Sequence, residues 1–498
     1  MNRTLVLILA CLSIGLCDLQ TVVSRAEDAA ADIRRTAAVV AVEKVQPAIG
    51  AVYAFGKQIQ GTGSGCVIDP RGYVLTAKHV TMTNHIVLLG GRPPLNAELV
   101  GTMPEFDVAI LKLGGPAFSR PGAPDYPRAA MPLDFVSLGI HDEVRTGESI
   151  LNIGSPGGRG IVVTQGIVSA VAFTAVNPLA ISLQSSTAFD ELLQFDAASN
   201  PGNSGGAVIN LLGQQIGLTV SGIRTEQGIH FALPMKTVRH SIASILNSEM
   251  RHRYTSGITI DPQLSLVKVT QIEEKSPAFE AGIQVGDTIV SVDGRELRDA
   301  IDWEFSRYDW RPGNKMTLGL ERGDQSVDVS ITLADRVGQK GIEVESPVAG
   351  LVCQFAPYDP QIANPLDDAF KPTGAPVVIE TVQAKPSHVT QEDHYELVFE
   401  GLLRVDQDGI YRVGLRSDDG SKLFIHDKLV VDNGGNHSPI LRTNWVDLQA
   451  GLHPIRIEFY EDEGQEMLEF LTAVGDAELA PVTPDKLFHR VAKSSAAE

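Results

Sequence analysis

Three residues of the chain have the types and the order of a catalytic triad: His79, Asp107 and Ser204. A serine hydroxyl is too weak a nucleophile at neutral pH unless an adjacent imidazole accepts its proton, and a carboxylate must orient that imidazole. His79 follows an apolar run that ends in Thr76-Ala77, Asp107 precedes a second apolar run, and Ser204 stands among glycines. This combination predicts a serine endopeptidase.

The serine loop, Gly202-Asn203-Ser204-Gly205-Gly206, also fits the G-x-S-x-G turn of α/β-hydrolases. That turn needs a strand before the serine, a helix after it, and the acid and histidine downstream. Residues 207–210 and 214–220 instead indicate strand, turn and strand, which favours a β-barrel context. The backbone N–H groups of Gly202, Asn203 and Ser204 are the predicted oxyanion hole, because glycine at 202 permits the unusual turn required.

The chain is long enough for about three domains of ~150 residues. Residues 37–250 contain many short apolar runs broken by Gly, Pro and Asp, which is typical of a barrel or sandwich, and a helix is expected at 235–249. Residues 256–333 combine a short helix after Ser276 with a strand at 287–292, and predict a small α/β module. A polar linker, 334–346, precedes an all-β domain at 347–489.

Composition excludes several classes of protein. The chain of 498 residues is 43% hydrophobic and 20% charged, which is typical of soluble globular proteins, and no apolar run of ~20 residues follows the N-terminus. A formal net charge of −20 would repel nucleic acid. Only Cys66 and Cys353 lie outside the first 26 residues, so no disulfide framework is expected, and Cys66 is expected to be a buried apolar side chain.

Residues 1–26 have the features of a signal peptide. Arg3 supplies the positive start, residues 5–16 are apolar, and Ser24-Arg25-Ala26 is a cleavage site of the small-x-small type. Export to the periplasm, the cell envelope or the medium is therefore expected. Lipid attachment at Cys17 and an uncleaved anchor are the alternatives.

The first domain resembles the HtrA (Deg) branch of the trypsin-like serine proteases. The matching stretches are Gly61 to Gly65, Thr76 to His79, Asp107 to Ala109, Asp196 to Ala198 and Asn200 to Gly206. The resemblance implies a mainly β, chymotrypsin-like protease of two six-stranded barrels with the triad in the cleft between them and no cofactor for catalysis. It also implies substrates that are unfolded or damaged envelope proteins, and a homotrimer.

By the same analogy the specificity pocket is lined by uncharged residues: Ala197, Ala198, Gly217 and Thr219. Cleavage is therefore expected after small or medium apolar side chains. Two segments, 172–193 and 114–131, are longer than in familiar members, and the first falls where the family carries regulatory loops.

Residues 256–333 resemble the PDZ module that follows the protease in this family. A PDZ groove binds protein C-termini as an added strand, and backbone N–H groups hold the carboxylate. The expected loop contains Ser256, Gly257 and Ile258. Ser256 stands where the family usually has an apolar residue, so a module that only packs remains the alternative.

Residues 347–489 resemble the PA-fourteen module, a β-sandwich found on secreted enzymes and adhesins. In its sugar-binding members paired aspartates hold Ca²⁺, and Asp418, Asp419 and Asn433 supply oxygen ligands suited to that ion. The alternative is that Asp418-Asp419-Gly420 is a hairpin turn. A glycan partner is therefore one expectation, and a chaperone or glycan-binding adhesin built on a protease scaffold is the alternative function.

Overall fold

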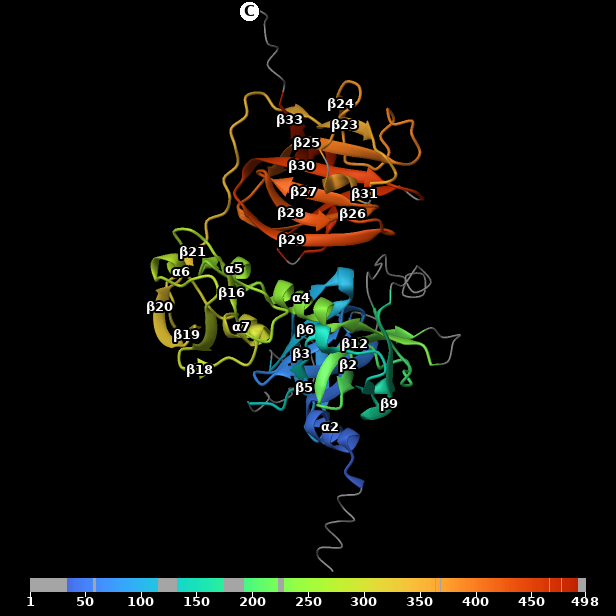
Figure 1. The fold of residues 1–498 in the computed structure, drawn as a ribbon, viewed down its shortest axis with the longest axis vertical. Coiled ribbons are helices and arrows are strands. Elements are labelled where there is room, and N and C mark those ends of the chain that lie inside the picture. The colour runs from blue at the N-terminus through green and yellow to red at the C-terminus, as the bar shows by residue number, and fades with distance from the viewer. Residues whose placement is uncertain are drawn as a thin grey trace, which may run out of the picture.

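The computed structural model describes residues 34–56, 60–114, 132–173, 192–222, 228–362, 364–367, 369–464, 466–475 and 477–490. The expected signal peptide and most of the segments 114–131 and 172–193 lie outside these ranges. The chain forms three parts: the C-terminal domain lies above, and the protease-like domain and the small α/β domain lie side by side below it (Figure 1).

The first barrel is a closed ring of antiparallel strands in the order β1-β2-β3-β6-β5-β4. Its interior is apolar, and Cys66 is fully buried in it as expected. Its strands are β1 (Ile49–Phe55), β2 (Gln60–Asp69), β3 (Tyr73–Ala77), β4 (Asn84–Leu89), β5 (Leu95–Met103) and β6 (Val108–Leu113). The helix α2 (Ala37–Val45) precedes it, and the Thr36 hydroxyl caps that helix by accepting from Val39 N at 3.3 Å.

The second barrel has the strand order β11-β8-β9-β10-β13-β12, and pairing between β11 and β12 closes it. A short strand β7 (Ser137–Leu138) adds to β12 in parallel. The other strands are β8 (Ser149–Gly154), β9 (Val162–Phe173), β10 (Leu192–Phe195), β11 (Ala207–Asn210), β12 (Gln214–Gly222) and β13 (His230–Pro234). The two barrels confirm the predicted chymotrypsin-like, mainly β class.

The expected helix at 235–249 forms in two pieces, α4 (Met235–Leu246) and α5 (Ser248–Arg251). Asn247 between them has φ 23°, outside the helical region, so the helix ends earlier than its periodicity predicts. The buried face of α4 includes Val238, Ile242 and Ile245 and packs into the core of the barrels.

The α/β domain contains the short helix and strand expected from its sequence. The Ser276 hydroxyl caps α6 (Pro277–Glu280) by accepting from Phe279 N. Its remaining elements are β14 (Tyr254–Thr255), β15 (Ile258–Ile260), β16 (Val269–Ile272), β17 (Thr288–Val292), β18 (Arg295–Glu296), α7 (Ala300–Ser306), β19 (Lys315–Arg322), β20 (Gln325–Thr332) and β21 (Ala334–Asp335). Strand β21 pairs with β14, so the module extends two residues into the stretch expected to be a linker.

Helix α7 is docked on the first barrel by apolar and charged contacts. Ile301 and Phe305 belong to the apolar core of the protease-like domain, and the Phe305 ring lies 4.5 Å from that of Tyr73. Beside them two fully buried carboxylates, Asp69 of β2 and Asp302 of α7, face each other across the domain boundary.

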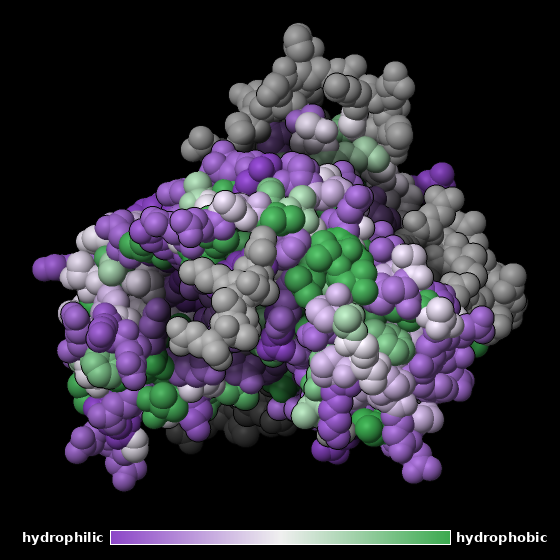
Figure 2. Space-filling model, turned by 90° about the horizontal axis from the view of Figure 1, so that it is seen from above, coloured by the Kyte–Doolittle hydropathy of each residue, from purple (hydrophilic) through white to green (hydrophobic). Residues whose placement is uncertain are grey.

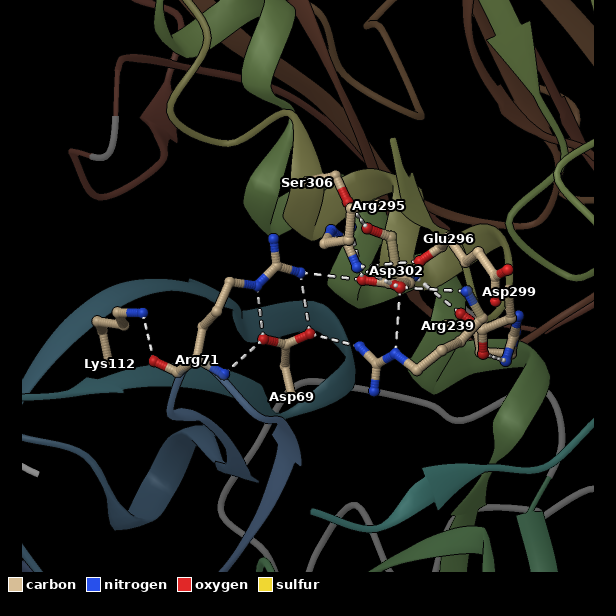
Figure 3. Close-up of polar contacts among 10 residues, drawn as sticks. Asp69, Arg71, Lys112, Arg239, Arg295, Glu296, Asp299, Asp302 and Ser306 are labelled. Carbon is tan, nitrogen blue, oxygen red and sulfur yellow. Dashed lines mark hydrogen bonds and ion pairs between the residues drawn. The ribbon is translucent and has the colours of Figure 1, made fainter. Parts of the chain in front are cut away.

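Two arginines bridge these carboxylates (Figure 3). Arg71 contacts Asp69 through Nε at 2.7 Å and Asp302 through Nη2 at 3.0 Å. Arg298 contacts Asp69 through Nη2 at 2.6 Å and Asp302 through Nε at 3.1 Å. We call Asp69, Arg71, Arg298 and Asp302 the latch, because each arginine joins a carboxylate of one domain to a carboxylate of the other.

The C-terminal domain is a β-sandwich, as predicted. One sheet has the order β22-β33-β25-β30-β27-β28, with β23 beside β25 and β24 beside β23, and the other has the order β29-β26-β31-β32. Its strands are β22 (Val348–Ala349), β23 (Leu351–Pro357), β24 (Val377–Ile379), β25 (Tyr395–Val405), β26 (Gly409–Asp418), β27 (Ser421–Ile425), β28 (Lys428–Asn433), β29 (Ile440–Leu448), β30 (Gly451–Glu461), β31 (Met467–Val474), β32 (Ala480–Pro481) and β33 (Leu487–His489). The stretch before it is held against this domain, since Gln339 N donates to Asp447 O at 2.7 Å and Ile342 N to Leu452 O at 2.8 Å.

The surface seen from above is mainly hydrophilic, and its apolar areas are separated by polar ones (Figure 2). In the parts of the chain that the structure describes, no helix has both the length and the apolar character needed to cross a membrane.

Candidate active site

His79 and Asp107 are brought together by neighbouring strands of the first barrel. His79 lies in the 3₁₀ turn η2 (Lys78–Val80) after β3, Asp107 directly precedes β6, and Ala77 pairs with Val108 where these strands lie side by side. The Asp107 carboxylate accepts from both the backbone and the ring of His79: Oδ1 lies 2.8 Å from His79 N, and Oδ2 lies 2.6 Å from His79 Nδ1. Asp107 therefore fixes both the position and the orientation of the imidazole.

Ser204 comes from the second barrel, in the loop before β11. Its carbonyl oxygen accepts from Ser64 N of β2 at 2.8 Å, which joins the nucleophile loop to the first barrel. Its hydroxyl donates to the carbonyl oxygen of Val220 at 3.1 Å. Within the described residues no hydrogen bond joins this hydroxyl to His79.

The three predicted oxyanion donors differ in availability. Asn203 N donates to Asn200 O at 2.9 Å and is thus already used within the loop. The N–H groups of Gly202 and Ser204 have no hydrogen-bond acceptor among the residues described. Gly202 has φ 100°, and a Cβ there would lie 2.5 Å from Gly157 N, so this position requires glycine.

Ser64 supports the nucleophile loop from β2, a role that the sequence did not reveal. Its hydroxyl donates to Gly202 O at 2.7 Å and accepts from Ser155 N at 2.7 Å. Behind it, Thr76 Oγ1 donates to Ser64 O at 2.7 Å. The run Gly61 to Gly65 was the available signal, because Ser64 is a small polar residue placed among glycines of a buried strand.

The four residues predicted to line the specificity pocket are unequally exposed. Ala197 and Thr219 are buried, and the Thr219 hydroxyl donates to Asn152 Oδ1 at 2.9 Å. A Cβ at Gly217 would lie 2.9 Å from the Ala232 Cβ, so Gly217 faces packed side chains. Ala198 is exposed, and its carbonyl oxygen is held by Asn152 Nδ2 at 3.1 Å. The pocket lining stays a prediction, and Asn152 is a further buried residue that shapes this loop.

His85, six residues after His79 in the sequence, is structural. It is 1% exposed, and its Nε2 accepts from Met82 N at 3.0 Å. Burial lowers its pKa to about 4, so it is neutral at physiological pH.

The loop predicted to hold a peptide carboxylate is engaged by the chain itself. Ser256 is fully buried, and Glu249 Oε1 accepts from its N–H at 3.1 Å and from its hydroxyl at 2.6 Å. The Ser256 hydroxyl also accepts from Ile258 N at 3.2 Å, and Gly257 between them has φ 79°. No feature of the sequence around Glu249 predicted that an internal carboxylate would lie on this loop.

The predicted calcium ligands lie close together in the C-terminal domain. Asp418 and Asp419 are adjacent, and Ser421, two residues after Asp419, pairs with Asn433 on the next strand. Asp418, Asp419 and Asn433 are all buried. Asp419 Oδ1 accepts from His437 N at 2.8 Å, while Asn433 Nδ2 donates to Ile440 O at 3.1 Å.

The charge around these residues is negative. Burial, with the adjacent Asp419 carboxylate, raises the pKa of Asp418 to about 6, and no Lys or Arg in the described ranges pairs with either aspartate. Glu461 is also fully buried, and neither of its carboxylate oxygens has a partner within the described part of the chain. The described residues hold no group of three or more His, Cys, Asp and Glu arranged for a metal, so a cation there would also need the Asn433 amide. That donor chemistry fits a hard cation such as Ca²⁺.

Three protein families match this chain. Residues 63–218 match the trypsin-like peptidase domain, residues 255–333 the PDZ domain and residues 378–486 the PA14 domain. Among solved structures, the serine endoprotease from Yersinia pestis is 30% identical with a TM-score of 0.33, covering 59% of this chain and 96% of that one. The HtrA-type protease AlgW with a decapeptide is 26% identical with a TM-score of 0.35, covering 60% of this chain and 98% of that one.

Curated relatives match more than half of this chain. The probable periplasmic serine endoprotease DegP-like of Brucella suis biovar 1 (strain 1330) is 30% identical over 297 residues, 56% of this chain and 53% of that protein, so the chain spans about half of its length. The serine endoprotease DegS of Escherichia coli (strain K12) is 30% identical over 324 residues, 59% of this chain and 85% of that protein. With this coverage of DegS, and with a matching trypsin-like domain followed by a PDZ domain, the chain belongs to the HtrA family of trypsin-like serine endoproteases.

Proposed function

We propose that the protein is an exported serine endopeptidase that hydrolyses unfolded or damaged envelope proteins after small or medium apolar residues. The observation that carries the proposal is the two-point hold of Asp107 on His79, on the barrel that contacts the Ser204 loop. The periplasmic names of curated relatives support export.

The proposed chemistry follows from which nitrogen of the His79 ring is already hydrogen-bonded to Asp107. Because Asp107 Oδ2 holds the Nδ1 side of the His79 ring, Nε2 is the nitrogen left to accept the Ser204 proton. The Ser204 oxygen then attacks the scissile carbonyl, and the N–H groups of Gly202 and Ser204 stabilise the oxyanion. His79 returns the proton to the leaving amine, and water repeats the sequence to release the acyl group.

The hydrogen bond from Ser204 to Val220 O adds one requirement. The hydroxyl must exchange the Val220 carbonyl oxygen for His79 Nε2 as its acceptor before it can lose its proton.

Labelling with a serine-reactive phosphonate tests the proposal. The wild-type protein is expected to incorporate one label at Ser204 and to degrade casein, and Ser204→Ala is expected to lose both. Persistent casein degradation by Ser204→Ala would overturn the assignment. Failure of the wild type to react, with protection of unfolded proteins from aggregation retained in both forms, would favour the chaperone or adhesin alternative.

For the PDZ domain we propose binding of protein C-termini, with Glu249 as an internal competitor. Its carboxylate accepts from the groups of Ser256 that a peptide end would approach. Since Arg307 Nη1 also lies 3.4 Å from Glu249 Oε1, an alternative partner is present when a peptide displaces it. The homotrimer stays a prediction.

For the C-terminal domain we propose a Ca²⁺-dependent glycan site at Asp418, Asp419 and Asn433. Two buried carboxylates without a basic partner in the described chain support it.

Titrating Ca²⁺ into the full chain in a calorimeter should give a saturable heat of binding. Asp419→Asn should abolish this heat, and Asp432→Asn, at an exposed neighbouring position, should retain it. Absence of heat in the wild type would contradict the metal site and favour a simple hairpin.

A further inference from the structure

The C-terminal domain contacts the protease-like domain directly beside the catalytic aspartate. Glu105 lies in the 3₁₀ turn η3 (Pro104–Phe106), two residues before Asp107, and its side chain is 1% exposed. Its Oε2 accepts from Arg412 Nη2 at 2.7 Å, and its Oε1 accepts from the hydroxyl of Thr443. A buried carboxylate of the protease-like domain is thus satisfied by two residues of the other domain.

Both partners are held rigidly on the second sheet of the sandwich. Arg412 lies on β26 and Thr443 on β29, which are adjacent antiparallel strands, and Arg412 Nε donates to Thr443 Oγ1 at 3.3 Å. The Arg412 side chain is 8% exposed. Because β strands rather than loops carry both groups, the contact has a defined geometry.

The next residue of η3 is held from the same sheet. The Arg442 guanidinium lies over the Phe106 ring, 5.3 Å from its centre, and the same ring makes an edge-to-face contact with His240 of α4 at 6.4 Å. Nearby, Arg251 of α5 lies 5.8 Å from the Trp445 ring centre. The turn η3 is therefore packed between the C-terminal sheet and the protease-like domain.

The end of this turn sets the conformation of Asp107. Asp107 N donates to Pro104 O at 3.2 Å, and its φ of 56° places a non-glycine residue in the left-handed region. Such a conformation persists only where the surroundings hold it. Since the same residue positions His79, movement of η3 would move the imidazole.

We propose that Arg412 and Thr443 are positioning residues for the catalytic triad, and that the C-terminal domain holds Asp107 in place through Glu105. The inference rests on the proposed endopeptidase function. It assigns the PA14 domain a direct part in peptide hydrolysis, in addition to any ligand that the domain binds. Displacement of this sheet from η3 would lower the rate of cleavage without any change in the substrate groove.

The test uses the full chain with Arg412→Ala, Thr443→Val and Arg412→Lys. For a short peptide substrate, Arg412→Ala is expected to lower kcat per titrated active site by roughly tenfold or more, since small misplacements of catalytic groups cost up to about a hundredfold. KM should stay unchanged, and Arg412→Lys should recover part of the loss. If Arg412→Ala does not fold, Thr443→Val removes one hydrogen bond to Glu105 without leaving an unpaired charge.

Proton NMR supplies a readout of the hydrogen bond between His79 and Asp107, which would not move if Arg412 only stabilised its own domain. In the Ser204→Ala background, the far-downfield resonance of the His79 Nδ1 proton bonded to Asp107 is expected to broaden or shift with Arg412→Ala. The matched control is Arg416→Ala, because Arg416 lies on the same strand and pairs with Glu469 at 2.7 Å within its own domain. An unchanged resonance and unchanged kcat in both Arg412→Ala and Thr443→Val would overturn the inference. This spectroscopic test needs no activity, so it separates failure of the inference from failure of the proposed function.

Discussion

Asn in place of Asp107 is expected to lower kcat about ten-thousandfold, the cost of removing the carboxylate of a serine protease triad while keeping its shape. Asp107 accepts at both oxygens, from His79 N and His79 Nδ1, at 2.8 Å and 2.6 Å. An amide can accept at only one of them. Its NH₂ group would face a ring nitrogen and favour the tautomer that carries its proton on Nε2, which is the nitrogen needed as the base.

Peptide hydrolysis by Asp107→Asn measures this effect, with circular dichroism to verify the fold. Asp134→Asn is the control, because Asp134 is an exposed carboxylate of the same domain that pairs with Arg92 at 3.5 Å. A loss of less than tenfold in Asp107→Asn would contradict the assigned role. Loss of the fold would show that Asp107 mainly supports the turn between η3 and β6.

Replacing Asp302 by Ala is expected to destabilise the contact between the PDZ and protease-like domains by about 3 kcal/mol, the lower end of the cost of removing one partner from a buried ion pair. Asp302 has a fully buried side chain and accepts from Arg71, Arg295 and Arg298. We expect a cost at the lower end of that range because the side chains of Arg71 and Arg298 are each 36% exposed to solvent. Both arginines also keep Asp69 as a partner after Asp302 is removed.

Denaturant unfolding of the full chain and limited proteolysis measure this change, and Asp328→Ala, an exposed position of the PDZ domain, is the control. Equal proteolysis of Asp302→Ala and wild type would contradict the latch.

The stabilisation of this domain contact by Asp302 should also depend on pH. Burial raises the pKa of Asp302, but hydrogen bonds from Arg298 and Arg295 outweigh burial and lower it from 3.8 to about 2. The stabilisation is therefore fully present above pH 3.8 and is lost as the pH falls toward 2, a transition that Asp302→Ala lacks.

The sequence by itself determined the features that depend on short stretches of chain. The triad order and the glycines around Ser204 predicted the protease class, and the Ser276 cap predicted the start of α6. The apolar runs at 207–210 and 214–220 predicted two strands, and the structure has β11 (Ala207–Asn210) and β12 (Gln214–Gly222) there. The glycine loop, the helix cap and the strand patterns each lie within a few residues of the structure they predict, so local sterics and hydrogen bonding are sufficient to specify them.

Only the tertiary structure decided which distant groups meet. Glu105 and Arg412 are separated by 307 positions, and Arg71 and Asp302 by 231. Glu249 contacts the Ser256 loop because the helix breaks at Asn247 and turns α5 toward the PDZ domain. The Ser204 hydroxyl donates to Val220 O, which lies on β12 of the same barrel. By chemistry alone, any of several charged residues could have paired with Glu105 or with Asp302. The packing of the three domains against one another selects which residue lies within hydrogen-bonding distance, and no local pattern in the chain records that packing.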